Sequence, residues 1–516
     1  MFYKHNGKNY EKWILAAILI VAFIFRFQDI TSIPPGLYPD EAINGNNALV
    51  ALETGDYKIF YPDNNGREGL FINVQAQFLR VFGPEPWALR TVSAVFGLLT
   101  VLGLYFLVRL LFNWQIASIA GFYLAVSFWH VNFSRIGFRA IMVPFLMVWG
   151  FYFLWRGLKN FKFSDFALSG IFFGLGFHTY IAFRFVPFII IFVLLAYWLR
   201  IKKDYGHHEY LGLRNEYIRR FALFFLTAFL TALPILYYFW QNPADFLGRG
   251  GQVSIFEARE PLKEFFKSLG LALASFNFNG DFNWRHNFSG EPLLFWLVGA
   301  FFAVGLIKSL VKMFKKQKEH GHPAALHVLL LSWFFIMLLP SALTREGVPH
   351  ALRLIGALPA AMIFATEGTW WFFETLIHWY REKDIHPLES PRKKENEAKF
   401  IVGTALIILM FAIGIAEYDK YFNKWVKRPE VREAFAGDFV EMGKQINQLP
   451  KELSKYVVVN VGGVLVGEIP MPAQTVMFIS QTYTEEKQKE KNVFYILPGE
   501  EKYITHPNAI VLPLIK

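Results

Sequence analysis

The chain contains 516 residues, of which 54% are hydrophobic and only 18% are charged, and its formal net charge is +11. A soluble globular protein is excluded, because so few polar residues could not cover its surface. The chain has no cysteine, which excludes disulfide bonds and thiolate metal sites. Lys and Arg lie in short loops between apolar segments, so the positive charge does not indicate a nucleic-acid partner.

Apolar segments long enough to cross a bilayer recur along most of the chain. A span needs about 17–25 apolar residues. Window length predicts about eleven spans, near residues 13–28, 87–112, 115–132, 140–157, 166–183, 185–200, 221–240, 293–313, 324–342, 351–373 and 400–417. No small-residue cleavage site follows the first segment, so we expect an uncleaved helix. The expected fold class is an α-helical polytopic membrane protein.

The loops between these spans alternate in charge. Lys and Arg are concentrated at the N-terminus and in four loops, Arg156–Lys162, Arg200–Arg220, Lys308–Lys318 and Arg381–Lys399. By the positive-inside rule these loops and the N-terminus are cytoplasmic, and the C-terminus is external. We therefore expect a multi-pass protein of the cell membrane (plasma or inner), with the long loop 29–86 on its outer side.

Residues 1–417 then form a transmembrane domain, and residues 418–516 a separate external domain. Val457–Val461 and Val493–Leu497 alternate or run apolar between turn residues, as strands do. Val431–Ile446 has the spacing of a helix. These patterns predict a small α/β domain.

Asp40 and Glu41 form an acidic pair shortly after the first span. They lie in Ile33-Pro-Pro-Gly-Leu-Tyr-Pro-Asp-Glu-Ala42, which opens an amphipathic helix that ends near Gly55. In a structural interpretation, Asp40 is the N-cap and Glu41 a first-turn acid favoured by the helix dipole. In a functional one, they supply a general base or the ligands of a cation bound with an anionic substrate. The residues alone leave both open.

Two further stretches carry charge near the outer face. Arg67 and Glu68, in Asn64-Asn-Gly-Arg-Glu-Gly69, are either substrate contacts or, as the spacing favours, part of an ordinary turn. Arg135 and Arg139 flank a glycine between two spans. They either anchor to headgroups or hold a phosphate.

Polar groups also lie near the outer end of a later span. His178, Tyr180 and Arg184 fall within seven consecutive residues there. Ionisable residues at membrane depth are costly, which makes these three candidates for substrate binding.

The external segment Asn279–Asn287 is dense in hydrogen-bonding groups. Asp281 and His286 are candidates for metal ligands, an acid/base pair or turn residues. With no cysteine and one local histidine, the pattern is weak for a dedicated zinc site. Together with Arg285, it suits a surface for a sugar or an acceptor.

Arg345, His350 and Arg353 come just before the tenth span and at its start. A helix N-terminus would add partial positive charge for an anion at this point. The alternative is a capped helix with an interfacial arginine, and we favour phosphate binding.

Together these motifs resemble the GT-C membrane glycosyltransferases. The resemblance rests on the Asp40-Glu41 pair, on Phe82-Gly83 with Trp87-Ala-Leu-Arg90-Thr-Val-Ser93, and on Pro349-His350 with Arg353. The most similar branch is glycosyltransferase family 39-like, which includes protein O-mannosyltransferases and aminoarabinose transferases. Its bacterial members are also similar in Gly280-Asp281, Arg285-His286-Asn287, Tyr421-Phe422, Trp425, Val431 and Ala434-Phe435.

The resemblance implies transfer of a sugar, with inversion, from a polyprenyl-phosphate carrier to a protein, lipid or glycan hydroxyl on the outer face. It implies that Asp40 is the general base and that Glu41 contacts a metal or the acceptor. The one cofactor it suggests is an optional divalent cation, Mg²⁺ or Mn²⁺. Related enzymes often carry a second acid after the third span. Residues 135–140 contain no carboxylate here, so Asp281 or Glu346 would have to substitute.

The chemistry is consistent with the residues. A lipid-phosphate sugar is already activated, so no nucleotide-binding loop is needed, and the sequence has none. The enzyme must deprotonate a hydroxyl and stabilise the departing phosphate, for which an external acid and external arginines suffice.

Two other functions compete with this one. A membrane transporter or lipid flippase would line its path with such charges, but the sequence shows no inverted repeat and its charges collect at one face. The external loops could also bind a partner glycan without catalysis.

Overall fold

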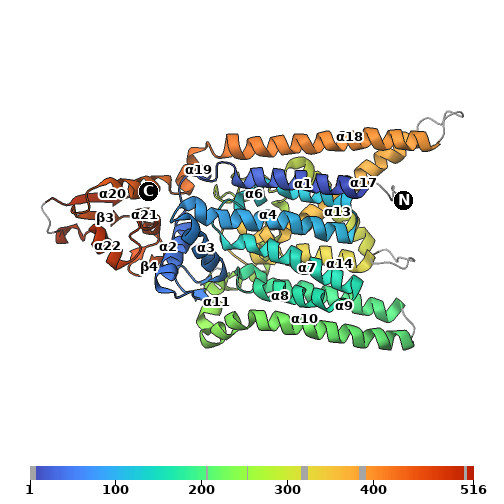
Figure 1. The fold of residues 1–516 in the computed structure, drawn as a ribbon, viewed down its shortest axis with the longest axis horizontal. Coiled ribbons are helices and arrows are strands. Elements are labelled where there is room, and N and C mark those ends of the chain that lie inside the picture. The colour runs from blue at the N-terminus through green and yellow to red at the C-terminus, as the bar shows by residue number, and fades with distance from the viewer. Residues whose placement is uncertain are drawn as a thin grey trace.

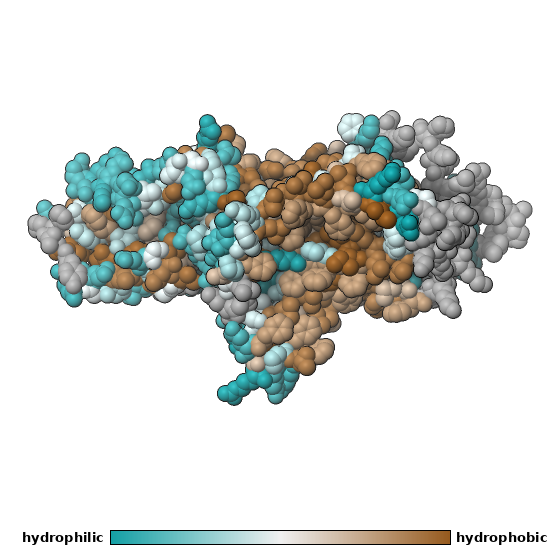
Figure 2. Space-filling view, turned by 90° about the horizontal axis from the view of Figure 1, so that it is seen from below, coloured by the Kyte–Doolittle hydropathy of each residue, from teal (hydrophilic) through white to brown (hydrophobic). Residues whose placement is uncertain are grey.

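The computed structural model describes residues 7–204, 207–252, 254–314, 323–382, 391–504 and 508–515. Long helices run side by side along the molecule (Figure 1). The described N-terminus lies at one end of them, and the C-terminal sheet, α2 and α3 lie at the other. The face seen in Figure 2 is apolar over the middle of the molecule and hydrophilic toward the C-terminal end.

The helices of the apolar layer follow one another in up-and-down order. Their bounds are α1 (Gly7–Phe27), α4 (Pro86–Leu111), α5 (Trp114–Val126), α6 (Phe128–Phe133), α7 (Met142–Asn160), α8 (Phe163–Gly176), α9 (Val186–Asp204), α10 (His207–Gln241), α13 (Trp296–Phe314), α14 (Pro323–Ile336), α15 (Leu339–Ala342), α16 (Ala351–Leu354), α17 (Leu358–Glu382) and α18 (Pro391–Tyr418). Short 3₁₀ turns are η1 (Arg139–Ile141), η2 (Ile181–Phe185), η3 (Ile255–Glu257), η4 (Ile355–Ala357) and η6 (Glu501–Tyr503), and a π-helix is η5 (Asp419–Trp425).

Eight segments within the described ranges are long and apolar enough to cross a membrane. They are Pro86–Leu111, Arg139–Asn160, Ile181–Leu199, Gly212–Gln241, Trp296–Phe314, Ala325–Ala342, Ala351–Glu382 and Lys394–Trp425. They correspond to eight of the eleven predicted spans, and the predicted fold class is confirmed: the chain is a multi-pass membrane protein. The other three are helices too: α1 carries Glu11, Lys12 and Arg26, and α5 and α8 have 13 and 14 residues.

Small residues let the helices of this layer approach closely. A Cβ added at Gly305 of α13 would lie 1.8 Å from the carbonyl oxygen of Phe364, and one at Gly368 of α17 would lie 2.0 Å from that of Phe301. Glycines are enriched at such contacts because lipid supplies no hydrophobic drive between helices, so packing has to hold them together.

The elements outside this layer lie mainly at the end that carries the C-terminus (Figure 1). In the first long loop they are α2 (Pro39–Thr54), β1 (Phe60–Tyr61), β2 (Arg67–Glu68) and α3 (Leu70–Phe82), and later α11 (Pro243–Gln252) and α12 (Pro261–Ala274). The C-terminal elements are α19 (Pro429–Ala434), α20 (Gly437–Gln448), β3 (Lys455–Val459), β4 (Leu465–Val466), β5 (Ile469–Pro470), α21 (Ala473–Ser480), α22 (Glu485–Lys491), β6 (Val493–Ile496) and β7 (Ile510–Leu514).

Three of the C-terminal strands form a parallel sheet in the order β6-β3-β7, with Lys455 opposite both Val493 and Ile510, and β4 and β5 form an antiparallel pair. Both predicted strands are present, as β3 and β6. The helical spacing predicted over Val431–Ile446 corresponds to two helices, α19 and α20. Ala436 separates them with a left-handed backbone (φ 53°).

This C-terminal region packs on α2. A Cβ at Gly45 would lie 2.5 Å from the Phe478 ring, so only glycine allows this approach. Asn46 Nδ2 donates to Gln474 Oε1 (2.8 Å), and Thr475 Oγ1 donates to the Leu37 carbonyl (2.9 Å). The C-terminal region thereby fixes the helix that carries the acidic pair.

Candidate active site

The start of α2 separates the two acids of the pair. Tyr38 is the N-cap and Pro39 the first helical residue, so Asp40 is not the N-cap that one interpretation of the sequence required. Glu41 completes the cap, since its Oε1 accepts from the Tyr38 N–H (3.3 Å). Proline is favoured at this first position because its missing N–H would be unpaired there anyway. The predicted helix and its end at Gly55 are confirmed.

Glu41 is fully buried in an ion pair. Its Oε2 accepts from Arg90 Nε (3.0 Å) and from the Gly137 N–H (2.7 Å), and its Oε1 accepts from Arg90 Nη2 (3.1 Å). Arg90 also donates to the carbonyls of Pro34 and Gly36. Glu41 thus ties the first loop to α4 and to the loop before α7, and its carboxylate does not share a site with that of Asp40.

Asp40 faces a cavity of about 150 Å³. Its Oδ1 accepts from Asn64 Nδ2 (2.8 Å), which holds the carboxylate in place. The cavity is lined by Tyr38, Asp40, Asn44, Arg67, Phe138, Arg139, Ala140, Tyr180, Asn283, Arg285, His286, His350 and Leu352. Seven of the residues proposed from the sequence therefore meet at one place, although they come from five separate parts of the chain.

Three arginines, Arg67, Arg139 and Arg285, line this cavity, and we call them the cavity arginines. Arg67 is buried and held by α2: Nη1 donates to Asn44 Oδ1 (2.7 Å) and Nη2 to Asn47 Oδ1 (2.6 Å). Burial, and secondarily the nearby Arg139, lowers the pKa of Arg67 to about 10. It remains a cation at neutral pH.

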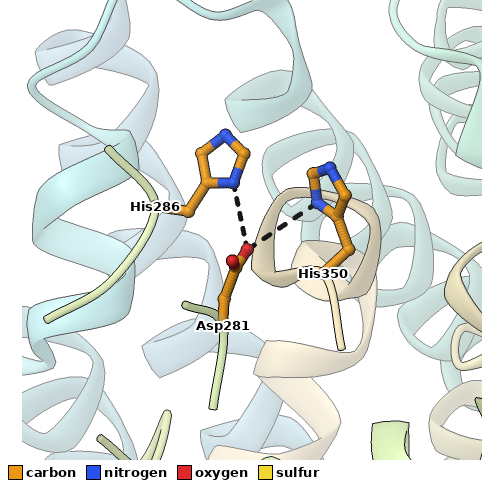
Figure 3. A group of neighbouring side chains, drawn as sticks. All are labelled: Asp281, His286 and His350. Atoms are coloured by element: carbon orange, nitrogen blue, oxygen red, sulfur yellow. Dashed lines mark hydrogen bonds and ion pairs between the residues drawn. The ribbon is translucent and has the colours of Figure 1, made fainter. Parts of the chain in front are cut away.

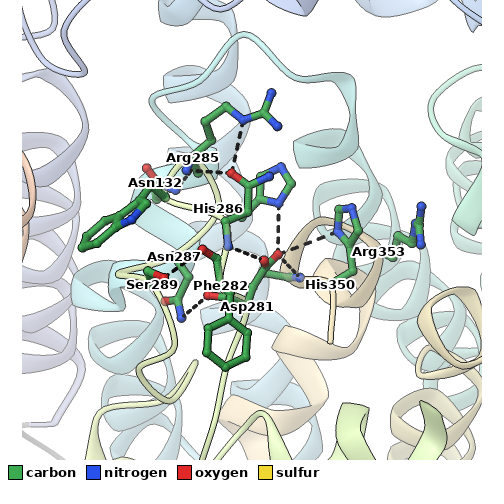
Figure 4. Close-up of polar contacts among 12 residues, drawn as sticks. Asn132, Asp281, Phe282, Arg285, His286, Asn287, Ser289, His350 and Arg353 are labelled. Atoms are coloured by element: carbon green, nitrogen blue, oxygen red, sulfur yellow. Dashed lines mark hydrogen bonds and ion pairs between the residues drawn. The ribbon is translucent and has the colours of Figure 1, made fainter. Parts of the chain in front are cut away.

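Arg139 is paired and Arg285 is stacked. Arg139 Nε donates to Glu68 Oε2 (2.9 Å), and its guanidinium lies 5.5 Å from the Tyr180 ring centre. The Arg285 guanidinium lies 3.7 Å from the Tyr38 ring centre, and its Nε donates to Asn283 Oδ1 (3.2 Å). Burial lowers the pKa of Arg285 to about 10, so it too stays charged. Figure 4 shows its guanidinium pointing away from the Asp281 carboxylate.

Asp281, His286 and His350 meet at the edge of the cavity (Figure 3). His286 Nδ1 lies 3.0 Å from Asp281 Oδ2, and His350 Nδ1 lies 3.9 Å from the same oxygen. The two histidines line the cavity, whereas Asp281 lies behind them. Burial lowers the pKa of His286, and Asp281 partly opposes this effect.

Several residues proposed from the sequence lie elsewhere. Glu68 is buried behind Arg139. Arg345 is paired with Glu257 (2.8 Å), and Arg353 donates to Thr344 and Glu346, so neither lines the cavity. His178 bonds the Thr231 carbonyl, and Arg184 donates to that of Phe246. Arg135 is buried and donates to the carbonyls of Phe25, Gln28 and Ile33.

The sequence analysis missed six lining residues: Tyr38, Asn44, Phe138, Ala140, Asn283 and Leu352. Asn44 could have been predicted from the sequence, because it lies four residues after Asp40 in a predicted helix and therefore on the same face of that helix. Asn283 lies between two proposed residues. For Tyr38 and Phe138, the sequence offered no indication of a place in the site other than their aromatic side chains.

Comparison with known proteins identifies the fold as that of the GT-C glycosyltransferases. The chain is similar to ArnT from Cupriavidus metallidurans bound to undecaprenyl phosphate, with TM-score 0.55 and 14% identity, over 98% of this chain and 90% of ArnT. It is also similar to the oligosaccharyltransferase of Archaeoglobus fulgidus tethered to an acceptor peptide, with TM-score 0.53 and 16% identity, over 94% of this chain and 68% of that one.

A family model agrees with the fold. Residues 70–213 match the model described as dolichyl-phosphate-mannose-protein mannosyltransferase. No curated protein matches the chain. The predicted resemblance to GT-C, family 39-like membrane glycosyltransferases is therefore confirmed by the overall fold and by this segment.

Proposed function

We propose that this protein transfers a sugar from a polyprenyl-phosphate donor to an acceptor hydroxyl, with inversion, in the cavity lined by Asp40. The observation that carries the proposal is the juxtaposition of one partly exposed carboxylate with the three cavity arginines and two histidines. The relatives support the donor class, since ArnT was solved with undecaprenyl phosphate. The Lys/Arg-rich loops support an outward-facing cavity.

Asp40 is the general base in this proposal. The acceptor hydroxyl gives its proton to the carboxylate, and its oxygen attacks the anomeric carbon from the face opposite the phosphate. The bond from that carbon to the phosphate oxygen breaks, and its electron pair leaves with the polyprenyl phosphate. Asn64 orients Asp40 through its Oδ1, and a positioned base of this kind contributes about 10²–10⁴-fold.

The cavity arginines stabilise the departing phosphate, which gains negative charge as the sugar leaves. Arg67 and Arg139 are already held by partners. The Nη1 and Nη2 atoms of Arg285 make no hydrogen bond to any residue in the described ranges, so they can bind the phosphate directly. Fixed donors of this kind cost no reorganisation during the reaction. Leu352, Phe138 and Ala140 are the apolar aliphatic and phenyl side chains of the cavity lining.

The residues outside the cavity act indirectly. Glu41 positions α2, and Glu68 positions Arg139. In this proposal the phosphate-binding site is centred on Arg285, and no longer on Arg345 and Arg353 as the sequence suggested. The acceptor, whether protein, lipid or glycan, would approach from the side of Asp40.

The test uses the full-length protein in liposomes with polyprenyl-phosphate hexose, pentose or amino-sugar donors and a membrane extract as acceptor. We expect free polyprenyl phosphate and a glycosylated product, both measured by mass spectrometry. Donor that crosses the bilayer intact would show a transporter or flippase instead. No release of polyprenyl phosphate from any donor would overturn the proposal.

A further inference from the structure

Three potential metal ligands converge at the edge of the cavity. Asp281 and His286 come from the segment between α12 and α13, and His350 comes from the loop before α16. One ligand atom from each lies within 4.8 Å of the other two, and no other such group of three is found in the described ranges. Figure 3 shows both imidazole rings turned toward the same carboxylate.

The carboxylate of Asp281 is fixed before any ligand binds. Its Oδ2 accepts from the Ala351 N–H (2.8 Å), and its Oδ1 accepts from the Asn283 N–H (2.8 Å). Figure 4 shows several dashed contacts that end on the Asp281 carboxylate, among them those from His286 and His350. Metal-binding carboxylates and histidines are held by such outer partners, which orient them and reduce the cost of ordering.

The rings are ordered by packing. His286 packs on Phe133, with ring centres 5.6 Å apart, and on His350 at 4.8 Å. Asp281 and His286 are buried, and His350 is only 18% exposed. The ligand set is therefore preformed and shielded from bulk water.

We propose that Asp281, His286 and His350 bind a divalent transition-metal cation of the Zn²⁺ class, with its remaining coordination position open to the cavity. Imidazole nitrogen and carboxylate oxygen are the ligands that Zn²⁺ and Co²⁺ prefer, and three protein ligands with an open position are typical of catalytic zinc sites. Mg²⁺ and Mn²⁺ favour oxygen ligands and should bind more weakly.

The distances suit such an ion. Bonds of about 2.0–2.2 Å in a tetrahedron place ligand atoms about 3.3–3.6 Å apart. The two nitrogen-to-oxygen distances here, 3.0 and 3.9 Å, bracket that value, and the three ligand atoms lie within 4.8 Å of one another, so rotation of the imidazole rings would bring them to this spacing.

Hydrogen bonds to Asp281 Oδ2 are made by the Ala351 N–H (2.8 Å) and at the His286 Nδ1 atom (3.0 Å), whereas His350 Nδ1, at 3.9 Å, lies beyond hydrogen-bond distance. A carboxylate oxygen has two lone pairs. With a cation present, one lone pair accepts from Ala351 and the other binds the metal, while each histidine uses its own lone pair.

A metal ion at this site would take part in the proposed sugar transfer, and its catalytic role therefore rests on the proposed function. The positive charges of the cavity arginines are balanced by Asp40, Glu68 and Asp281. A divalent cation would make the site net positive where the departing phosphate gains charge. The ability to bind the ion does not depend on this role.

The test measures metal binding by the purified full-length protein. After treatment with a chelator, the protein is dialysed against Zn²⁺ or Co²⁺, and the bound ion is counted by mass spectrometry. We expect one tightly bound ion per chain and the visible absorption of tetrahedral Co²⁺. His286→Asn and His350→Asn should each weaken binding by at least about 10–100-fold, whereas His378→Asn, an exposed histidine on α17, should not.

The thermal unfolding midpoint gives a second readout if a variant folds poorly. Zn²⁺ should raise the midpoint of the wild type and of His378→Asn, but not that of His286→Asn or His350→Asn. A wild type that retains no ion, or variants that bind it as well as the wild type, would overturn the proposal. Because neither readout uses sugar transfer, failure of this proposal is distinguishable from failure of the proposed function.

Discussion

The cavity has two walls that are built differently. The first-loop wall consists of Asp40, Asn44 and Arg67, and its polar contacts come from the same loop, through Asn64 and Asn47. The histidine wall consists of Arg285, His286 and His350, and joins two segments that lie far apart in the chain. The first wall is a local motif held by α2, and the second exists only in the folded protein. We therefore expect the first-loop wall to supply the base, Asp40, and a secondary phosphate contact, Arg67, and the histidine wall to supply the main phosphate contact, Arg285.

The largest effect should come from Asp40→Asn in the first-loop wall. The amide keeps the shape of the side chain but cannot take a proton, so transfer should fall by about 10²–10⁴-fold while donor binding persists. Because Tyr38 is the N-cap, Asp40→Ala should lose activity equally without loss of the helix cap. Transfer rate and thermal midpoint are measured for both, with the exposed Asp56→Asn as control. Near-normal transfer by the Asn variant would remove Asp40 as the base.

The second test separates Asp40 from its neighbour. Glu41→Gln leaves Arg90 buried without a counter-charge, and breaking a buried pair costs about 3–5 kcal/mol. The thermal midpoint should fall strongly, whereas Asp40→Asn should leave it nearly unchanged. Glu430→Gln, an exposed acid on α19, is the control. A stable but inactive Glu41→Gln protein would instead give Glu41 a direct catalytic role.

The third test addresses the histidine wall. Arg285→Gln removes the guanidinium whose Nη1 and Nη2 atoms make no hydrogen bond within the described ranges, and a charged hydrogen bond contributes about 1.5–3 kcal/mol. Affinity for polyprenyl phosphate should fall roughly 10–100-fold. Arg345→Gln is the matched control, since this arginine is paired with Glu257 away from the cavity. Equal losses in both variants, or a loss only in Arg345→Gln, would reject the clamp centred on Arg285.

The smallest effect should come from Gly45→Ala. Its Cβ would meet Phe478 and Leu89 at 2.5 and 2.9 Å, and such overpacking costs about 1–3 kcal/mol. Since α21 presses on α2 here, transfer should fall together with stability. Gly403→Ala, where a Cβ meets nothing within 4 Å, is the control. Full stability in Gly45→Ala would mean that the C-terminal region does not hold the first-loop wall.

The arrangement of helices follows from the sequence because membrane physics acts locally. An apolar stretch of sufficient length needs no distant partner to be recognised, and eight predicted spans match long apolar helices. The exceptions are informative: α5 and α8 are too short by themselves, and α1 carries charges. Helices of this kind depend on their neighbours in the bundle, which a window over the sequence cannot measure.

The site could be predicted only in part, for a related reason. Asp40 was found because its motif is contiguous. Arg345, His350 and Arg353 lie close together in the sequence, yet of these three only His350 lines the cavity. Which way a side chain points at the end of a span depends on long-range contacts, such as Glu257 for Arg345. Neither the charge of a residue nor its spacing in the sequence predicts these long-range contacts.

The most direct measurement is a structure of the full-length protein with bound polyprenyl phosphate. We expect the phosphate in the cavity, within about 2.7–3.2 Å of Arg285 and of Arg67 or Arg139, with Asp40 on the side where the sugar would lie. The chain offers another place for an anionic lipid, the groove beside Trp296 lined by Lys420, Lys424 and Arg428. A phosphate bound in that groove, with no density in the cavity, would contradict the assignment of the active site.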